Sequence, residues 1–206
     1  MTTAQLLASC RSLLDESSPS FYQNSEIYSW LNDAQREVAN TILALYKAKL
    51  EVDPKTELPE VLISLQSIIT GSASSPVAVP SDYLFLINMQ LENTINYPCF
   101  IKQEDKKLFF ESGNTFMQPT TTNPQVVVRN SGSGKELVFT PNTGTYAGTY
   151  LRIPPDISDA VDPILPDTCK SALIQFAYSR ALLKDQNHQD AIAAYQQFLQ
   201  MTQELY

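Results

Sequence analysis

Candidate catalytic groups are few in this chain, and they do not gather into a motif. The only histidine is His188, and the three cysteines, Cys10, Cys99 and Cys169, lie far apart. A single histidine excludes a metal site built from several histidines, and the cysteine spacing matches no metal-binding or redox pair. An odd number of cysteines is typical of a reducing compartment without a disulfide framework. We interpret the cysteines as small buried hydrophobic residues and expect no metal and no cofactor.

Two further segments resemble catalytic or binding features without matching them. Gly132 and Gly134 stand beside Lys135, as in a phosphate-binding loop, but the Gly-x-x-x-x-Gly-Lys-Ser/Thr spacing is missing. We therefore favour an ordinary hairpin turn there. His188 offers a lone general base, but it lies in a polar segment with no patterned partner, so a solvated or capping role is favoured.

Three carboxylates in the middle of the chain keep one enzyme hypothesis open. Glu104, Asp105 and Glu111 include the type of residue that supplies the acid in glycan hydrolysis, which needs two carboxyl groups flanking the scissile bond. Glu104 and Asp105 stand next to lysines at positions 102, 106 and 107, a pattern typical of a solvated turn of mixed charge. We favour the solvated turn and predict no catalytic residues.

The overall composition argues against a free-standing nucleic-acid binder. The chain has 206 residues, of which 43% are hydrophobic and 17% charged, with 14 Lys plus Arg against 22 Asp plus Glu and a net charge of −8. Affinity for DNA comes largely from basic side chains that neutralise phosphates, and an acidic chain lacks that balance. The low charge indicates that much of the polar surface contacts other proteins.

The chain shows no sign of a targeting or membrane segment. Residues 1–14 lack the basic start, apolar run and small-residue cleavage site of a signal peptide. The longest continuous apolar stretches, such as residues 83–87, fall far short of the ~20 residues needed to cross a bilayer. We expect a protein made in the cytoplasm with no membrane association.

The positions of the six glycines divide the chain into three blocks. All six lie between Gly71 and Gly148, and glycine is disfavoured inside helices by ~1 kcal/mol relative to alanine. The sequence therefore predicts an α+β fold: a helical bundle made from the N- and C-terminal helix pairs, with an inserted small antiparallel β module. The predicted parts are residues 1–70, residues 71–155, and a proline-rich connector with the last helices over residues 156–206.

In the N-terminal block we predict two long helices and a short one. The first covers about residues 4–15, because Thr2 and Gln5 have the spacing of a capping box. The second opens at Asn24 or Ser25, which are good N-caps. Its apolar residues recur every three or four positions: Ile27, Trp30, Leu31, Ala34, Val38, Ile42 and Leu45. Residues 60–69 fit both helix and strand periods, and we predict a helix there.

The middle block predicts a sheet or barrel of four to six short antiparallel strands. Turns rich in Asn, Gly, Pro and Ser separate the strand candidates. Besides the apolar region from residue 77 to 95, these candidates cover residues 108–110, 125–129, 136–140 and 149–153.

The C-terminal block is predicted to be helical after a stiff, proline-rich connector. Asp167 or Thr168 caps the first of its two helices. The last helix follows a polar break at residues 185–188, and its expected buried residues are Ile192, Tyr195, Phe198, Leu199 and Leu205.

The last helix carries the most unusual surface pattern in the sequence. Residues 186–206 contain six glutamines and no Lys or Arg, whereas a solvated helix usually mixes Glu and Lys. A neutral face that can form hydrogen bonds suits contact with neighbouring subunits, although a glutamine-rich solvated helix is the simpler alternative. The candidate interface residues are Gln189, Gln196, Gln197, Gln200, Gln203 and Tyr206.

Segments along most of the chain resemble the head–tail adaptor (connector) proteins of tailed bacteriophages. The first covers residues 13–15 and a helix with the sequence SEIYSWLNDAQREVA at residues 25–39. The second is VPSDY at residues 79–83, similar to the step that begins the sheet in that family. The third comprises TYLRIPP at 149–155, ILPD at 164–167 and the helix ALIQFAYSRA at 172–181. Residues 96–148 do not take part in the resemblance.

The resemblance implies a structural protein of the virion without enzymatic turnover, located at the head–tail junction after synthesis in the host cytoplasm. Such proteins form a homo-oligomeric ring, commonly of twelve copies, beneath the portal protein. The ring extends the channel through which genomic DNA passes without specific binding, and it docks tail or nozzle proteins. Two alternatives remain: a tail-completion or stopper protein one layer lower, and a virion-associated peptidoglycan hydrolase that uses Glu104, Asp105 or Glu111.

Overall fold

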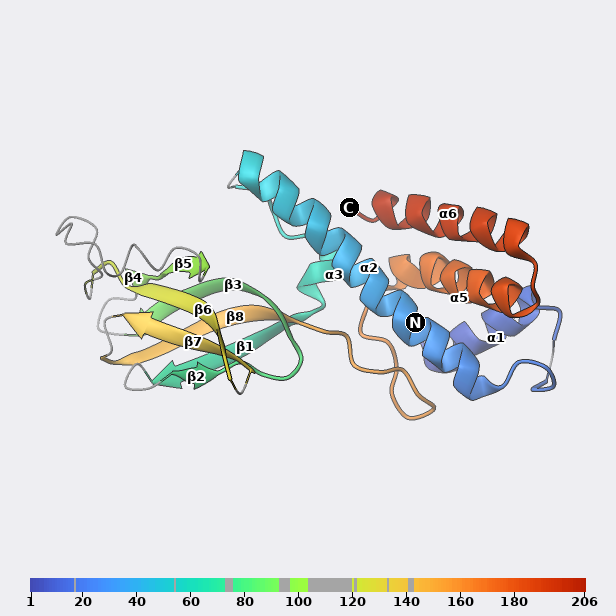
Figure 1. Ribbon diagram of the computed structural model, residues 1–206, viewed down its shortest axis with the longest axis horizontal. Helices are drawn as coiled ribbons and strands as arrows, with labels where there is room; N and C mark the ends of the chain where they lie inside the picture. The colour runs from blue at the N-terminus through green and yellow to red at the C-terminus, as the bar shows by residue number, and fades with distance from the viewer. Residues whose placement is uncertain are drawn as a thin grey trace. The chain divides into compact units, whose positions relative to one another are not determined.

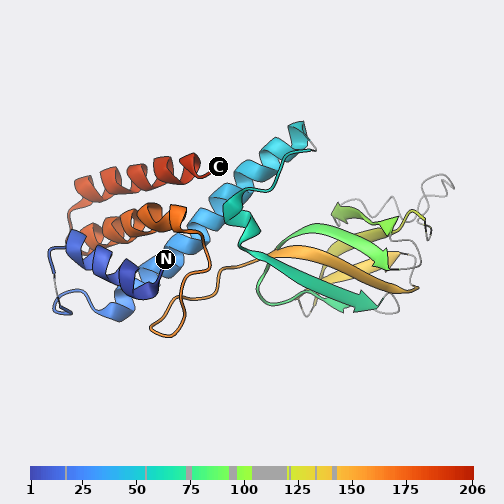
Figure 2. The ribbon, with the colours of Figure 1, turned by 180° about the vertical axis from the view of Figure 1, so that it is seen from behind.

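The computed structural model describes residues 1–16, 18–53, 55–72, 76–92, 97–103, 120, 122–132, 134–140 and 143–206. The fold is mixed α+β, as the sequence predicts, with five α-helices in these residues. The chain divides into two compact units (Figures 1 and 2). The helical unit comprises Met1–Leu65 and Ile153–Tyr206, and the β unit comprises Gln66–Arg152. No helix in the described ranges is both long and apolar enough to cross a membrane.

Two helices open the helical unit. They are α1 (Thr3–Leu13) and α2 (Asn24–Val52). The predicted capping box of α1 is present, because the Thr2 hydroxyl accepts a hydrogen bond from the Gln5 N–H and the Gln5 side chain accepts one from the Thr2 N–H. Glu26 plays the same part for α2, accepting the Gln23 N–H at 3.0 Å. The predicted stripe of α2 is buried at five positions, whereas Trp30 and Leu45 are only half-buried.

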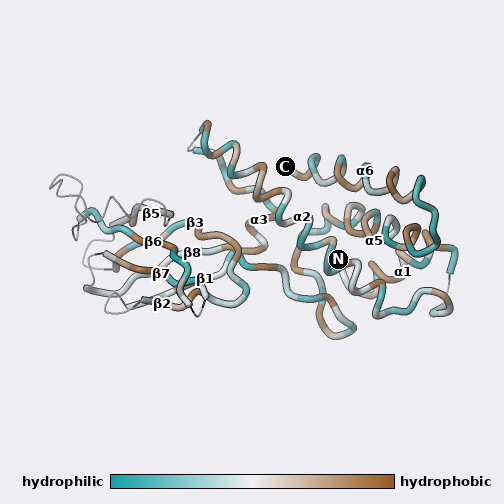
Figure 3. Tube along the Cα trace, viewed as in Figure 1, coloured by the Kyte–Doolittle hydropathy of each residue, from teal (hydrophilic) through white to brown (hydrophobic). Residues whose placement is uncertain are grey.

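Two further helices close the unit after a 3₁₀ turn. The turn η3 (Asp167–Cys169) leads into α5 (Lys170–Lys184), and α6 (His188–Glu204) follows after a short break. The rings of Phe176 and Phe198 meet edge-on, 5.0 Å apart, and the Tyr195 ring lies 5.6 Å from Phe198. The predicted burial of Ile192 is wrong, since its side chain is 60% exposed. Figure 3 shows hydrophobic and hydrophilic residues interleaved along these helices, as expected of amphipathic elements.

The prediction of a helix over residues 60–69 is only partly correct. A short helix, α3 (Glu60–Ile63), is followed at once by strand β1 (Gln66–Ser72). Ile68, Ile69 and Thr70 are β-branched and favour the extended chain once a partner strand is present. That partner is β8, which lies about 80 residues further along the chain.

The β unit contains two four-stranded sheets rather than the single sheet or barrel predicted. One sheet has the order β1-β8-β3-β4 and the other the order β2-β7-β6-β5. The pairs are antiparallel except for β5 and β6, which run parallel. The remaining bounds are β2 (Val77–Ala78), β3 (Tyr83–Glu92), β4 (Tyr97–Pro98), β5 (Phe100–Gln103), β6 (Gln125–Ser131), β7 (Gly134–Thr140) and β8 (Thr145–Arg152). The strand expected at residues 108–110 lies outside the described residues.

Side chains from both sheets build one core between them. Phe139 of β7 stacks on Tyr146 of β8 with ring centroids 4.1 Å apart. Leu86, Leu91 and Val126 are buried in the same cluster. Two sheets that share a core in this way form a sandwich, in which alternate residues of each strand point inward.

Candidate assembly interface

The outer side of α6 is the surface that the sequence singled out for subunit contacts. All five predicted glutamines of α6 and Tyr206 are exposed. At 100° per residue, Gln189, Gln196, Gln200 and Gln203 fall within one narrow stripe. The stripe faces away from the side of the helix that is buried through Phe198. These four glutamines lie along one exposed side of α6, and we call them the glutamine stripe. Gln200 Nε2 also donates a hydrogen bond to the Glu204 carboxylate at 3.3 Å, at the edge of this stripe.

The other two predicted residues contact other helices of the helical unit. The Gln197 side chain lies on another side of α6 and accepts a hydrogen bond from Gln175 Nε2 of α5 at 2.8 Å. The ammonium group of Lys49, on α2, lies 5.2 Å from the centre of the Tyr206 ring. Both residues therefore help to attach α6 to the rest of the helical unit as well as being exposed.

A second feature, which sequence reasoning missed, is a polar clamp on α2 that holds the connector. The Asn32 side chain forms two hydrogen bonds with the backbone of Ile157. Its Oδ1 accepts the Ile157 N–H at 2.6 Å, and its Nδ2 donates to the Ile157 carbonyl at 3.3 Å. Gln35, which is buried, donates to the Pro155 carbonyl at 3.3 Å. The clamp satisfies backbone groups of an irregular segment that would otherwise be buried without partners.

One ion pair and one hydrogen bond from a tyrosine extend the clamp along the same side of α2. Arg36 forms an ion pair with Asp156, and the Tyr28 hydroxyl donates a hydrogen bond to Asp159. Burial, together with the hydrogen bond to Asp159, raises the pKa of Tyr28 to about 12, so the phenol stays protonated and keeps donating. Residues 28, 32, 35 and 36 all lie within the segment that resembles phage adaptors. The sequence offers no other signal for the clamp, because its target lies about 120 residues away.

The connector also holds the start of α1. The Thr3 N–H donates to Asp162 at 2.7 Å, and the Thr3 hydroxyl donates to the Val161 carbonyl at 2.9 Å. The amino group of Met1 forms an ion pair with Asp167. A carboxylate at the beginning of a helix satisfies a free N–H and complements the helix dipole. The proline-rich segment is therefore tied to both N-terminal helices.

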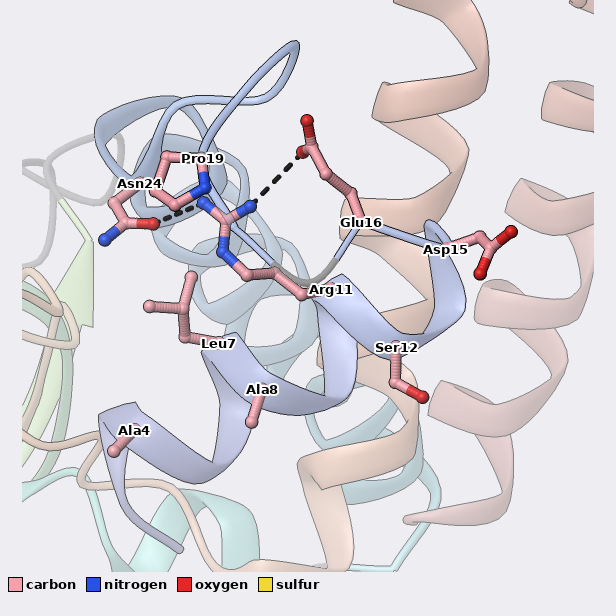
Figure 4. Close-up of a pocket in the computed structure, with 9 residues that line it drawn as sticks. All are labelled: Ala4, Leu7, Ala8, Arg11, Ser12, Asp15, Glu16, Pro19 and Asn24. Carbon is pink, nitrogen blue, oxygen red and sulfur yellow. Dashed lines mark hydrogen bonds and ion pairs between the residues drawn. The ribbon is translucent and has the colours of Figure 1, made fainter.

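A buried arginine organises the loop between α1 and α2 (Figure 4). The Arg11 guanidinium contacts the Glu16 carboxylate at 3.2 Å, the Tyr22 carbonyl at 3.1 Å and the Asn24 side chain. Burial alone would raise the pKa of Glu16, but N–H groups of the loop donate to it and, with Arg11, lower the pKa overall. A hollow of about 710 Å³ lies beside this cluster. Because the charge of Arg11 is already paired, we assign the cluster a structural role.

Two of the segments that resemble catalytic or binding features lie within the described residues. Gly134 pairs with Ser131 in the hairpin of β6 and β7, which confirms the predicted turn. His188 is the exposed first residue of α6. Glu104, Asp105 and Glu111 lie outside the described residues, so the hydrolase alternative is not tested by the geometry.

The thiols are in unreactive surroundings. Cys10 and Cys169 are buried, as predicted, whereas Cys99 is half-buried. Burial raises the pKa of Cys10 to about 12 and that of Cys169 to about 11, and it also raises the pKa of Cys99 to about 12. Thiolates are therefore scarce at neutral pH. Among the residues with described positions, no group of three or more His, Cys, Asp or Glu side chains is arranged to hold a metal ion.

The polar contacts described above tie parts of the helical unit to one another, and the candidate interface is the exposed, glutamine-rich side of α6. Depletion of charged residues is typical of the centre of protein–protein interfaces. The family model for the SU10 adaptor protein matches residues 1–205, and the chain belongs to that family. It is accordingly a phage adaptor-type structural protein of the virion. No curated protein sequence matches the chain.

Proposed function

We propose that the protein is a head-to-tail adaptor that forms a ring beneath the portal, extends the DNA channel and docks tail or nozzle proteins. The observation that carries this proposal is the match of the adaptor family over residues 1–205. The ring is expected to hold twelve copies. In this proposal residues 1–70 and 156–206 act together as one bundle, and residues 71–155 act as the module that meets the tail.

The glutamine stripe supports a role for α6 in contacts with the portal or with neighbouring subunits. Gln189, Gln196 and Gln203 present uncharged amide donors and acceptors, which cost less to strip of water than charged groups do. Gln200 belongs to the same stripe and is hydrogen-bonded to Glu204. Deleting α6 would be a poor test, because Phe198 is fully buried and its loss would damage the core. The outer surface is better tested by substitution.

The distribution of charge supports free passage of DNA. The β unit carries six Lys plus Arg and six Asp plus Glu, so the whole net charge of −8 belongs to the helical unit, which has eight and sixteen. Negative groups facing a channel repel phosphates and keep DNA from adhering to the wall. A strongly basic channel surface in a solved ring would contradict this part of the proposal.

The test of the proposed function is to mix the protein with the portal protein of the same phage and to examine the product by negative-stain electron microscopy and mass determination. A ring of this protein stacked on one end of the portal supports the adaptor role and gives the copy number. If the folded protein does not bind the portal, the adaptor role is refuted, and the stopper position one layer lower becomes the better hypothesis.

A pair of variants then tests α6. Gln196→Glu/Gln203→Glu adds two charges to the glutamine stripe and should reduce portal-bound protein at least tenfold. The matched control, Asn40→Asp/Ala44→Glu, adds two charges to exposed positions of α2. Equal binding of the two variants would show that the glutamine stripe is simply a solvated surface.

A further inference from the structure

An apolar groove runs between the end of α5 and the first half of α6. It has a volume of about 430 Å³, and most of its lining is hydrophobic. Two of the lining residues are exposed aliphatic side chains, Leu183 at 40% and Ile192 at 60%. Gln196 of the glutamine stripe lines the same groove. Adjoining exposed apolar residues of this kind mark a surface that another protein covers.

One cation lies in the groove, and it is available to a partner. Arg180 is the only charged residue among those that line the groove, and its guanidinium lies over the Phe176 ring, 4.8 Å from the centroid. It forms no ion pair with any residue that the structure describes. The neighbouring Lys184, by contrast, is paired with Glu26 at 2.8 Å. The groove therefore suits an apolar segment that carries a carboxylate.

The connector of the same chain presents such a segment. Residues 153–167 contain four aspartates and no Lys or Arg. Asp156 and Asp167 are in ion pairs, whereas Asp159 and Asp162 accept hydrogen bonds from uncharged groups and keep their charge available. Within this segment a tight turn closes through two backbone hydrogen bonds between Ser158 and Val161, at 3.1 and 3.2 Å. Ala160 and Val161 are exposed at its tip, between Asp159 and Asp162. The two aspartates are held by Tyr28 and Thr3, so the turn is rigid before it binds.

The groove and the turn lie on different sides of the helical unit. In both Figure 1 and Figure 2, α6 lies along one side of α5, and the loop of the connector projects on the other. Because Val161 is anchored to α1 through Thr3, the turn cannot reach the groove of its own chain. A contact between them must join two copies head to tail, and repeated head-to-tail contacts close into a ring when the rotation from one copy to the next closes.

We propose that the Ser158–Asp162 turn of one subunit enters the α5/α6 groove of the next, with Val161 against Leu183 and Ile192 and the connector aspartates facing Arg180. The inference rests on the proposed ring and names the contact that closes it. The apolar tip matches the apolar lining, and the acidic connector complements the single cation. Both surfaces belong to the same compact unit and are fixed before assembly.

Disulfide cross-linking tests the contact in the assembled particle. Val161→Cys/Ile192→Cys, made in a Cys99→Ser background, is mixed with the portal protein and then oxidised with copper phenanthroline. Cys10 and Cys169 are buried and contribute little background. A head-to-tail contact yields a ladder of covalent oligomers beyond the dimer, at least tenfold above the control. The control is Val161→Cys/Val52→Cys, in which the second thiol replaces a side chain that is 86% exposed on α2.

Substitution of Arg180 tests the same contact independently. Arg180→Glu should reduce ring formation on the portal at least tenfold, whereas Arg180→Lys should retain it. If rings form on the portal but the ladder does not exceed the control, or if Arg180→Glu assembles normally, the contact is refuted while the adaptor role stands. If no copy of the unmodified protein assembles on the portal, both the proposed function and this contact are overturned.

Discussion

Replacing Asn32 by alanine should loosen the connector and destabilise the helical unit. The substitution removes both hydrogen bonds to Ile157 and leaves its backbone N–H, in a residue only 2% exposed, without its 2.6 Å acceptor. A lost hydrogen bond costs about 0.5–1.5 kcal/mol, and a buried group left unsatisfied costs about 1–3 kcal/mol. We expect a loss of about 2–3 kcal/mol from the free energy of unfolding.

Trp30 makes this measurement specific to the helical unit. It is the only tryptophan, it lies on α2, and its ring is 6.0 Å from that of Tyr22. Its fluorescence during urea unfolding therefore follows the helices and not the β unit. With a urea dependence of about 1–3 kcal/mol per molar, the midpoint should fall by about 1 M.

Two further variants test whether the hydrogen bonds of Asn32 hold the connector. Asn32→Asp retains the acceptor for the Ile157 N–H and should lose about 1 kcal/mol, less than the alanine variant. Asp33→Ala removes a neighbouring side chain whose ion pair with Arg36 is exposed and 3.5 Å long. It should change stability by less than about 0.5 kcal/mol. If Asn32→Ala behaves like Asp33→Ala, the clamp does not hold the connector.

Three more expectations concern the cores and the acid response. Phe198→Ala should cost about 3–5 kcal/mol in urea unfolding because it empties a fully buried ring site, while Ile192→Ala, at an exposed position, should cost little. Gly148→Ala should lower the calorimetric unfolding temperature of the β unit, since a new Cβ would lie 2.4 Å from a backbone oxygen; Gly132→Ala meets nothing within 4 Å and should be close to neutral. The lowered pKa of Glu16 stabilises the fold above its ordinary value of 4.5, and that contribution should disappear as pH falls below it. Glu16→Gln should therefore flatten the unfolding free energy between pH 5 and 3, and an unchanged pH profile would contradict the role given to this carboxylate.

The helices were predictable where the pattern is local. Capping at Thr2 and the spacing of apolar residues along α2 depend on neighbours within a few positions, and the structure agrees with both. Which side of α6 is buried was less predictable. Its buried side is made of Ala191, Ala194, Phe198 and Thr202, so small residues packed against α5 replace the larger Ile192 that hydrophobicity favoured.

The features that could not be predicted from the sequence depend on partners that lie far along the chain. β1 becomes a strand because β8 pairs with it, and β5 joins β6 in parallel, which no hairpin rule predicts. The clamp could not be predicted for the same reason. Asn32 and Gln35 have the pattern of ordinary surface positions of a helix, and their partners in the connector are far away in the sequence. On the candidate interface, the sequence identified the exposed glutamines but could not show that Gln197 is engaged with α5.

The pairing of β1 with β8 has a consequence for how such proteins diversify. Gln66, the first residue of the β unit, is the register partner of Leu151, one residue before its end. The chain therefore enters and leaves this unit through two adjacent strands, whose Cα atoms in such a pair lie about 5 Å apart. An insertion with neighbouring ends can be exchanged with little strain on the host structure. Recombination between phage genomes at these two points would transfer the whole sandwich as one cassette and leave the clamp, the connector and the helices intact.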